Sequence, residues 1–554
     1  MSKVIGKECR FAVYVPPPEY DKPDMHFVKL QVHYDDGTIK PETKIFYNFQ
    51  RPYYVVHKGK RVYNQPKEWI SKDDVIEYSS TQSQLLSNAA RSLGMPYFKG
   101  TLRDLQKNPY LFGTDIKSTS ILKWAYQERF KETKQTYYSY ATFDTETDVL
   151  RGTNRIIMAT VVMGSKIFTA VLKDFVSGIH DPLGRIRSSY NEYLKDYIEK
   201  YSLTDETIIV EDELEILKKT FAFVHENKPD FLGIWNIDFD LNKVIQTCEK
   251  YSYPVAKLLS DPSVPDEYKY FKYTPGASQK RTASGKVQPL PAHSRWSTAQ
   301  CPASFYFIDA MQAYKQVRTG RPEESSYSLD SILQKELNLT KLKFDQANKY
   351  SGLAWHIYMQ KNYPIEYIVY NKFDSLSMLL LEAKVKDIAL STPSSAKCSD
   401  FSDIKSQPKK AIDDLNWFTQ ERNLVMGTSS EAVSDEITKG INVKGWVTNL
   451  AASLISEDGH RVIEEDPRII TSIYTNVGDL DVSSSYPHGV ITFNISKETT
   501  VKEVINIEDI PQATYEKDNM LLNNGHVDAI QWCTSLCQFP TLAELCDLYD
   551  KESK

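Results

Sequence analysis

The order of elements between residues 136 and 385 most limits what this chain can fold into. Three apolar segments, YYSYATFDTET, RIIMATVVM and KIFTAVL, read as strands, and only Gly164-Ser165 separates the second from the third. A two-residue loop of this kind joins antiparallel strands. Amphipathic helices and short buried strands follow. Antiparallel strands followed by strand–helix units predict a mixed sheet covered by helices.

Hydrophobic periodicity places the later elements of this region. It predicts helices over 213–224, 238–250 and 365–385, and strands over 230–235 and 305–308. Residues 276–300 are basic, rich in Gly, Pro and Ser, and without periodicity, so they read as a loop.

The rest of the chain predicts a multidomain α+β protein. Residues 1–135 read as a β-rich N-terminal domain, with a hairpin at Asp36-Gly37 and a helix over 82–92. Residues 386–410 are rich in Ser and Lys, which is typical of a linker. We expect 386–475 to be a linker and a return to the N-terminal domain, and 476–554 to be a separate region.

Composition excludes several classes of protein. Of the 554 residues, 41% are hydrophobic and 25% charged, which is ordinary for globular proteins and argues against disorder, collagen or a coiled coil. Seven cysteines are few and odd in number, so we expect a reducing, cytoplasmic environment rather than a disulfide framework. The N-terminus has no apolar signal region, and no apolar stretch could span a bilayer. No membrane partner is therefore expected.

Asp144 and Glu146 are the first candidate functional residues. They lie two apart on a predicted strand, so both project from one face while Thr145 projects from the other. Two adjacent carboxylates repel each other unless a cation neutralises them, so the pair favours binding of a hard metal ion. The alternative is a chance spacing, which Asp550 and Glu552 also show.

Two further patterns follow in sequence. Asn236-Ile-Asp-Phe239-Asp240 comes where a buried strand ends and a helix begins, where acidic residues also favour the helix dipole. Tyr370 and Asp374 lie four apart on a predicted helix and therefore share a face. A capping role for the aspartates and a chance spacing of the last pair are the structural alternatives.

These three patterns, in this order, resemble the exonuclease motifs of the family B DNA polymerases. They are D-x-E on a strand, N-x-x-F-D between a strand and a helix, and Y-x-x-x-D on a helix. The resemblance implies a ribonuclease-H-like 3′→5′ exonuclease domain over 136–385. It implies that the four carboxylates bind two Mg²⁺ ions, which Mn²⁺ would replace, and that Tyr370 orients the attacking water. It also implies that Asn236 and Phe239 bind substrate. The carried-over metal ligands are Asp144, Glu146, Asp240 and Asp374.

A further motif, Asp481-Val-Ser-Ser-Ser-Tyr486-Pro, resembles the first palm motif of the same family. The resemblance implies that Asp481 is a catalytic metal ligand and that Tyr486 packs under the sugar of the incoming nucleotide. The alternative is a strand that ends at a Tyr-Pro turn. The resemblance thus implies that residues 476–554 form a partial polymerase palm.

The other polymerase motifs are not found after this point in the sequence. A scan of residues 490–554 finds neither the K-x-x-x-N-x-x-Y-G pattern of the family's fingers helix nor the D-T-D-like motif of its second palm carboxylate, and we expect no thumb in this chain. The leading hypothesis is therefore the N-terminal subunit of a split, tailed-phage-like DNA-directed DNA polymerase that acts in a bacterial host cell. Its partners would be primer-template DNA, single-stranded 3′ ends, a second chain with the missing parts and, only with that chain, dNTPs.

Two other functions remain open at this stage. One is a stand-alone 3′→5′ DNA exonuclease with a vestigial palm, and the other is a non-catalytic scaffold that binds single-stranded DNA. The tail favours a docked partner, because residues 501–554 carry four lysines against ten acidic residues and so account for the net charge of −6. In the basic loop, Lys280, Arg281, Lys286 and Arg295 are expected to contact DNA phosphates.

Overall fold

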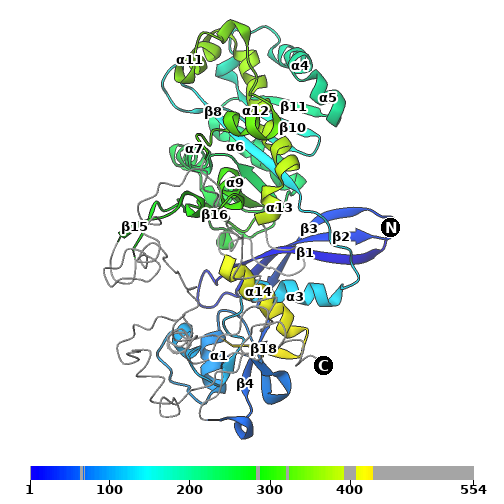
Figure 1. Ribbon diagram of the computed structural model, residues 1–554, viewed down its shortest axis with the longest axis vertical. Coiled ribbons are helices and arrows are strands. Elements are labelled where there is room, and N and C mark those ends of the chain that lie inside the picture. Colours follow the sequence, from blue (N-terminus) through cyan, green and yellow to red (C-terminus); the bar gives the residue numbers. More distant parts are fainter. Residues whose placement is uncertain are drawn as a thin grey trace, which may run out of the picture. The chain divides into compact units, whose positions relative to one another are not determined.

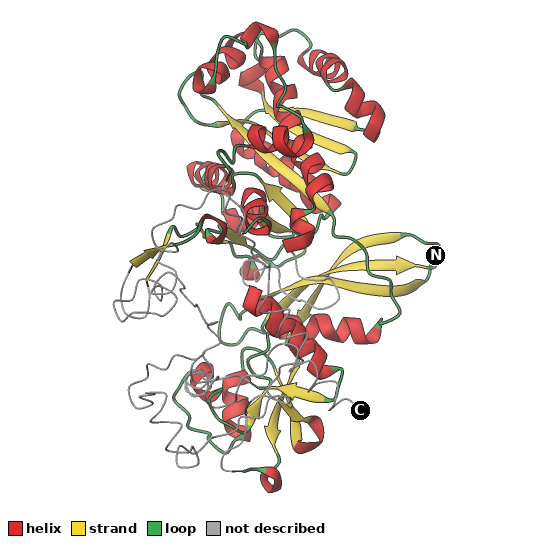
Figure 2. Ribbon diagram, viewed as in Figure 1, coloured by secondary structure: helices red, strands yellow, loops and turns green. Residues whose placement is uncertain are grey.

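The computed structural model describes residues 2–62, 67, 69–281, 287–319, 324–391 and 407–427. They form a mixed α+β unit with a β-rich N-terminus and a mixed sheet covered by helices (Figures 1 and 2). The predicted partial palm, with Asp481 and Tyr486, lies outside the described residues. Within the described part, no helix has the length and apolar character needed to cross a membrane.

The N-terminal region begins with a three-stranded antiparallel sheet. Its strands are β1 (Val4–Val15), β2 (Met25–Tyr34) and β3 (Ile39–Tyr47), paired in that order. The predicted hairpin at Asp36-Gly37 joins β2 to β3, and Gly37 has a φ of +81°, which glycine adopts without strain. Helix α3 (Ser118–Arg129) packs on β1.

A second small sheet completes this region. Strand β4 (Arg51–Val56) lies between β6 (Val75–Ser80) and β7 (Leu111–Phe112), and the predicted helix after β6 is α1 (Leu85–Ser92). Far along the chain, β18 (Leu424–Met426) pairs antiparallel with β5 (Trp69–Ser71). The chain thus comes back to its N-terminal region after residue 407.

The linker predicted over 386–410 includes regular structure at both ends. Helix α13 (Asp387–Ser391) follows directly after the long helix of the preceding domain, and α14 (Gln407–Gln420) begins before residue 410. Helix α14 packs against β18. The predicted linker therefore overlaps two helices, and its residues 392–406 lie outside the described part of the chain.

The predicted mixed sheet is present and has six strands, in the order β11-β10-β9-β8-β12-β17. Strand β9 runs antiparallel to its neighbours β8 and β10, whereas β12 is parallel to both β8 and β17. The edge strand β11, which pairs parallel to β10, was not predicted. The strands span Tyr140–Thr147 (β8), Ile156–Met163 (β9), Lys166–Leu172 (β10), Thr204–Val210 (β11), Phe231–Ile234 (β12) and Tyr306–Asp309 (β17).

The two-residue loop between β9 and β10 forms as predicted. Met163 and Lys166 face each other across it, and Gly164 has a φ of +58°. The predicted helices are also present, as α6 (Glu213–Asn227), α7 (Ile237–Lys250) and α12 (Pro364–Val385). The Asp212 side chain caps α6 by accepting a hydrogen bond from the Glu215 N–H.

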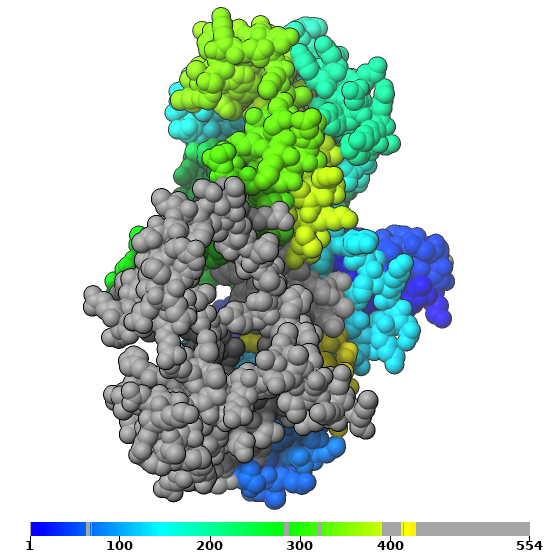
Figure 3. Space-filling view, viewed as in Figure 1, coloured from blue at the N-terminus to red at the C-terminus, as the bar shows by residue number. Residues whose placement is uncertain are grey.

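Helices α6 and α12 cover opposite faces of this sheet. Side chains alternate along β8, so Thr142 and Phe143 point to different faces. The Phe143 ring packs against Phe221 of α6, while the Thr142 hydroxyl donates to the carbonyl of Ser375 on α12. Helix α12 also packs on α4 (Pro182–Tyr193) and on the preceding helix α11 (Gly352–Asn362). In Figure 3 the yellow-green surface of this part of the chain adjoins the blue-green surface near α4.

The segment predicted as a loop over 276–300 contains short strands, and this part of the prediction was wrong. Strands β14 (Gln279–Arg281) and β15 (Val287–Pro289) form an exposed hairpin, and β16 (Thr298–Gln300) pairs with β13 (Lys272–Thr274). Three-residue strands are too short to show an alternating pattern, so their periodicity could not be read from the sequence.

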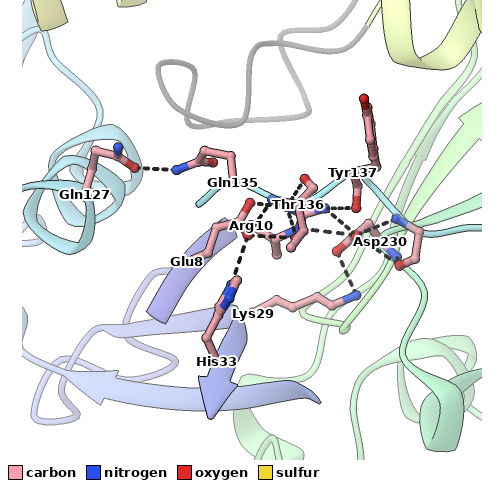
Figure 4. A network of polar contacts seen from close by, with 10 residues as sticks. Glu8, Arg10, Lys29, His33, Gln127, Gln135, Thr136, Tyr137 and Asp230 are labelled. Carbon is pink, nitrogen blue, oxygen red and sulfur yellow. Dashed lines mark hydrogen bonds and ion pairs between the residues drawn. The ribbon is translucent and has the colours of Figure 1, made fainter. Parts of the chain in front are cut away.

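A buried polar network joins the N-terminal sheet to the start of β12 (Figure 4). Asp230 pairs with Arg10 at 3.1 Å and with Lys29 at 2.9 Å, and it also accepts hydrogen bonds from Ser139. Burial alone would raise the pKa of Asp230, but Lys29 and Arg10 hold it at about 2. Arg10 also pairs with the buried Glu8, so two cations face two carboxylates, and this charge balance lets all four side chains be buried.

Candidate metal centre

The carboxyl ends of two parallel strands, β8 and β12, bring the candidate residues together. Asp144 and Glu146 lie near the end of β8. Asn236 follows β12, and Asp240 lies in the first turn of α7. Helix α12 crosses the same face of β8 as the two strand carboxylates and supplies Asp374.

Three carboxylates form a group that could hold a metal ion. Single oxygen atoms of Asp144, Glu146 and Asp374 all lie within 4.8 Å of one another. The first two side chains are half-buried, and Asp374 is buried. One oxygen of Asp374, Oδ1, has no hydrogen-bond partner among the described residues although it is inaccessible to solvent. An unsatisfied buried carboxylate oxygen is a suitable ligand for a hard cation.

The alternation along β8 agrees with the prediction from D-x-E. Asp144 and Glu146 both face α12, where they accept hydrogen bonds from Asn371 Nδ2 (2.6 Å) and from Tyr367 Oη. Thr145 faces the other way. Its N–H and hydroxyl both donate to Asp240 Oδ1, at 3.0 and 2.6 Å.

Asp144, Glu146 and Asp374 are called the triad below. Asp240 lies beside the triad but does not belong to it. Its side chain is buried and is held against the backbone of β8 by Thr145. Its negative charge nevertheless reaches Asp144, since it is the strongest of the neighbouring charges that raise the pKa of that residue. The structure thus brings all four predicted carboxylates together, three in one group and the fourth close behind it.

All four carboxylates resist ionisation. Burial, followed by the charges of Asp240, Glu146 and Asp374, raises the pKa of Asp144 well above its ordinary value. Burial raises the pKa of Glu146 to about 7 and that of Asp240 to about 7, although hydrogen bonds from Tyr367 and Thr145 oppose the change. Burial also raises the pKa of Asp374. A bound divalent cation would relieve this repulsion.

Lys341 is a functional candidate that the sequence analysis missed. Its Nζ lies 2.5 Å from Asp374 Oδ2 and 3.0 Å from Tyr370 Oη. Burial lowers the pKa of this lysine, but the charges of Asp374, Asp144 and Glu146 outweigh burial and raise it. Lys341 therefore places a positive charge against the triad. It lies in an aperiodic segment between two motifs, so no spacing in the sequence marked it.

Tyr370 stands among aromatic side chains beside the triad. Its ring stacks on Tyr367 with centroids 5.8 Å apart and contacts Trp355 of α11 at 4.8 Å. Tyr367 Oη also lies 2.8 Å from His356 Nδ1. Burial, followed by the charges of Asp374, Glu146 and Asp144, raises the pKa of Tyr370 well above its ordinary value, so it remains a neutral phenol.

The sequence also carries a signal for Tyr367 and Asn371, which were not predicted as site residues. These two residues are four apart on α12, as Tyr370 and Asp374 are, so they share a second face of the same helix. That face meets Asp144 and Glu146.

The predicted substrate-binding residues occupy different places. Asn236 and Phe239 are exposed at the start of α7, next to the buried Asp240, and the Phe239 side chain is 45% exposed. Lys280 and Arg281 lie on the exposed strand β14, rather than on the elements that carry the carboxylates. Tyr486 and Asp481 fall outside the described residues.

Comparison with known proteins gives no family for this chain. No protein-family model matches the sequence, and no curated protein matches it either. Its chemistry must therefore be inferred from the residues of the site itself.

Proposed function

We propose that this chain is a metal-dependent 3′→5′ DNA exonuclease whose active site lies in a ribonuclease-H-like domain. The observation that carries the proposal is the convergence of Asp144, Glu146 and Asp374 within 4.8 Å, with Asp240 beside them. These residues come from three motifs that lie far apart in the sequence, and the fold unites them. The mixed sheet with helices on both faces agrees with the fold that the motif resemblance implies.

The residues present fit a hard divalent cation such as Mg²⁺ or Mn²⁺. Carboxylate oxygens are the ligands such ions prefer, and Asp374 Oδ1 is buried with no hydrogen-bond partner in the part of the chain that the structure describes. Asp144, Glu146 and Asp374 would hold one ion, and Asp240 would contribute to a second. When bound, such ions supply a hydroxide from water and neutralise charge on the leaving 3′-oxygen.

The protein side chains would position the reactants. The Tyr370 phenol can hold a water molecule by hydrogen bonding, because it stays neutral and its oxygen is fixed by Lys341 at 3.0 Å. Lys341 would balance the negative charge of the carboxylates before substrate binds. The exposed Phe239 can stack on an unpaired base, as aromatic side chains do in proteins that bind single strands.

The test is degradation of single-stranded DNA with a label at either end, by the full chain in Mn²⁺ or in EDTA. Wild-type protein should release mononucleotides from the 3′ end in Mn²⁺ only. Asp144→Ala should abolish this release, and Tyr370→Phe should weaken it less. Asp196→Ala, which removes an exposed carboxylate on α5 (Lys195–Tyr201), is the matched control and should stay active. Equal degradation by wild type and Asp144→Ala would refute the proposal.

We further propose that this exonuclease belongs to the N-terminal subunit of a split family B DNA polymerase, as the Asp481–Pro487 motif suggests. Primer-template DNA and a second polymerase chain would be its partners, and the cytoplasm of a bacterial host its location. The alternative is a stand-alone exonuclease. Primer extension by the chain mixed with a candidate partner chain distinguishes the two, because only a split polymerase subunit should support it.

A further inference from the structure

A row of threonines lies beside Asp144 in the sheet. Thr160 on β9 is the direct cross-strand neighbour of Asp144 on β8, and Thr169 on β10 is the direct neighbour of Thr160. Both threonines are completely buried. Their hydroxyl oxygens are 2.9 Å apart. Two buried hydroxyls in an apolar sheet need partners, and these two satisfy each other in part.

Asn371 of α12 connects this row to Asp144. Its Oδ1 accepts a hydrogen bond from Thr160 Oγ1 at 2.5 Å, and its Nδ2 donates to Asp144 Oδ2 at 2.6 Å. The Asn371 side chain is completely buried. A continuous line of hydrogen bonds therefore runs from β10 through β9 and α12 to a carboxylate of the triad.

The donor and acceptor chemistry of these groups decides which group donates in each hydrogen bond of this line. A hydroxyl has one proton to donate, and Thr160 donates its proton to Asn371, so Thr169 must be the donor in the hydrogen bond between the two threonines. The Thr160 proton at Oδ1 then turns the Nδ2 group of Asn371 toward Asp144. With the amide reversed, two oxygens would face each other at the Asp144 end of the side chain.

We propose that Thr169, Thr160 and Asn371 form a positioning relay that fixes the carboxylate of Asp144 for binding a divalent cation. The inference deepens the proposed exonuclease function and rests on it. None of the three residues touches substrate in this proposal, because each acts through Asp144. Partners of this kind around metal ligands typically change metal affinity about 10- to 100-fold when removed.

The same hydrogen bonds could instead do no more than attach α12 to the sheet, and the chain offers a matched control for that role. Thr142 is completely buried on β8, and its hydroxyl donates to the Ser375 carbonyl of α12 at 2.8 Å. Thr142→Val removes a buried hydroxyl between the same helix and sheet, without a link to a carboxylate. Thr160→Val removes one that has such a link.

The experiment measures Mn²⁺ binding to the full chain by electron paramagnetic resonance of free Mn²⁺, with urea unfolding to check folding. We expect the Kd for Mn²⁺ to rise about 10- to 100-fold in Asn371→Leu. It should rise several-fold in Thr160→Val and remain at the wild-type value in Thr160→Ser and Thr142→Val. In Thr160→Val, exonuclease activity should recover at saturating Mn²⁺, because all the ligands are retained.

The outcomes separate this inference from the function on which it rests. If wild type binds Mn²⁺ and Thr160→Val binds it no more weakly than Thr142→Val, the relay is refuted while the exonuclease stands. If wild type neither binds Mn²⁺ nor degrades DNA, the proposed function fails and the relay fails with it. Should Asn371→Leu not fold, the comparison of Val with Ser at position 160 still decides the question.

Discussion

Replacing Glu146 with glutamine should stabilise the metal-free protein at the expense of its metal site. The substitution keeps the shape of the side chain and its ability to accept the hydrogen bond from Tyr367, but it removes one negative charge from the triad. We therefore expect Glu146→Gln to unfold at higher urea concentration than wild type at pH 8 in EDTA.

The pKa of Glu146 sets the size of this effect. Burial raises it from 4.5 to about 7, and each unit corresponds to about 1.4 kcal/mol, so the ionised side chain costs about 3 kcal/mol. Partial exposure to solvent reduces this to about 2 kcal/mol. Because the folded state holds the Glu146 proton more tightly than the unfolded state, the contribution of this group to stability is highest below pH 4.5 and falls as the pH rises through about 7.

Urea unfolding of both proteins at pH 8 and pH 5, in EDTA and in excess Mn²⁺, checks this reasoning. The difference between the two proteins should be about 2 kcal/mol at pH 8 and should shrink at pH 5. Mn²⁺ at about 100 times its Kd should stabilise wild type by about 2.7 kcal/mol and the variant much less. Equal stability of the two proteins at pH 8 in EDTA, together with equal gains from Mn²⁺, would contradict the charge-repulsion argument.

Three other outcomes are expected. Asp230→Asn leaves Lys29 buried without its counter-charge and leaves Arg10 with Glu8 alone, so it should lower the free energy of unfolding by about 3–5 kcal/mol; an additional Lys29→Met should restore part of it, and urea unfolding measures both. Replacing Lys280, Arg281, Lys286 and Arg295 with alanine should reduce the salt slope of single-stranded DNA binding by about 0.7 for each phosphate that the chain no longer neutralises, and an unchanged slope would refute this role for the four side chains. The chain alone should extend no primer, whereas a complex with its partner chain should, and Asp481→Ala should remove extension while sparing degradation. Extension by the chain alone would show that a second palm carboxylate was overlooked.

Much of the sheet could be predicted because its signals are local. The Gly164-Ser165 loop, the apolar strands beside it and the 22-residue helix α12 each depend on neighbouring residues in sequence. Strand β11 was missed because TDETIIV combines polar residues on an edge strand with a short apolar end. The strands within 276–300 were missed because a three-residue strand is too short to show the alternation of apolar and polar residues.

The residues of the candidate site also fall into those that the sequence could predict and those that it could not. Asp144, Glu146, Asp240 and Asp374 could be predicted because three local motifs, in this order along the chain, resemble those of a known exonuclease family. Lys341 could not, since it reaches Asp374 from an irregular segment whose path depends on tertiary packing. The partners of Asp144 depend on cross-strand register, which sequence alone does not supply.

The residues on helix α12 limit where the protein can tolerate insertions or deletions. It carries Tyr367 and Asn371, which hydrogen-bond to Glu146 and Asp144 of β8, and Asp374, which lies within 4.8 Å of both carboxylates. It also carries Tyr370, whose hydroxyl accepts a hydrogen bond from Lys341. One inserted residue near the start of α12 would turn everything after it by about 100°. The four side chains could then not all keep their partners. An insertion in the exposed hairpin of β14 and β15 would shift none of them. Natural variation in length should therefore accumulate in that hairpin and be absent from α12.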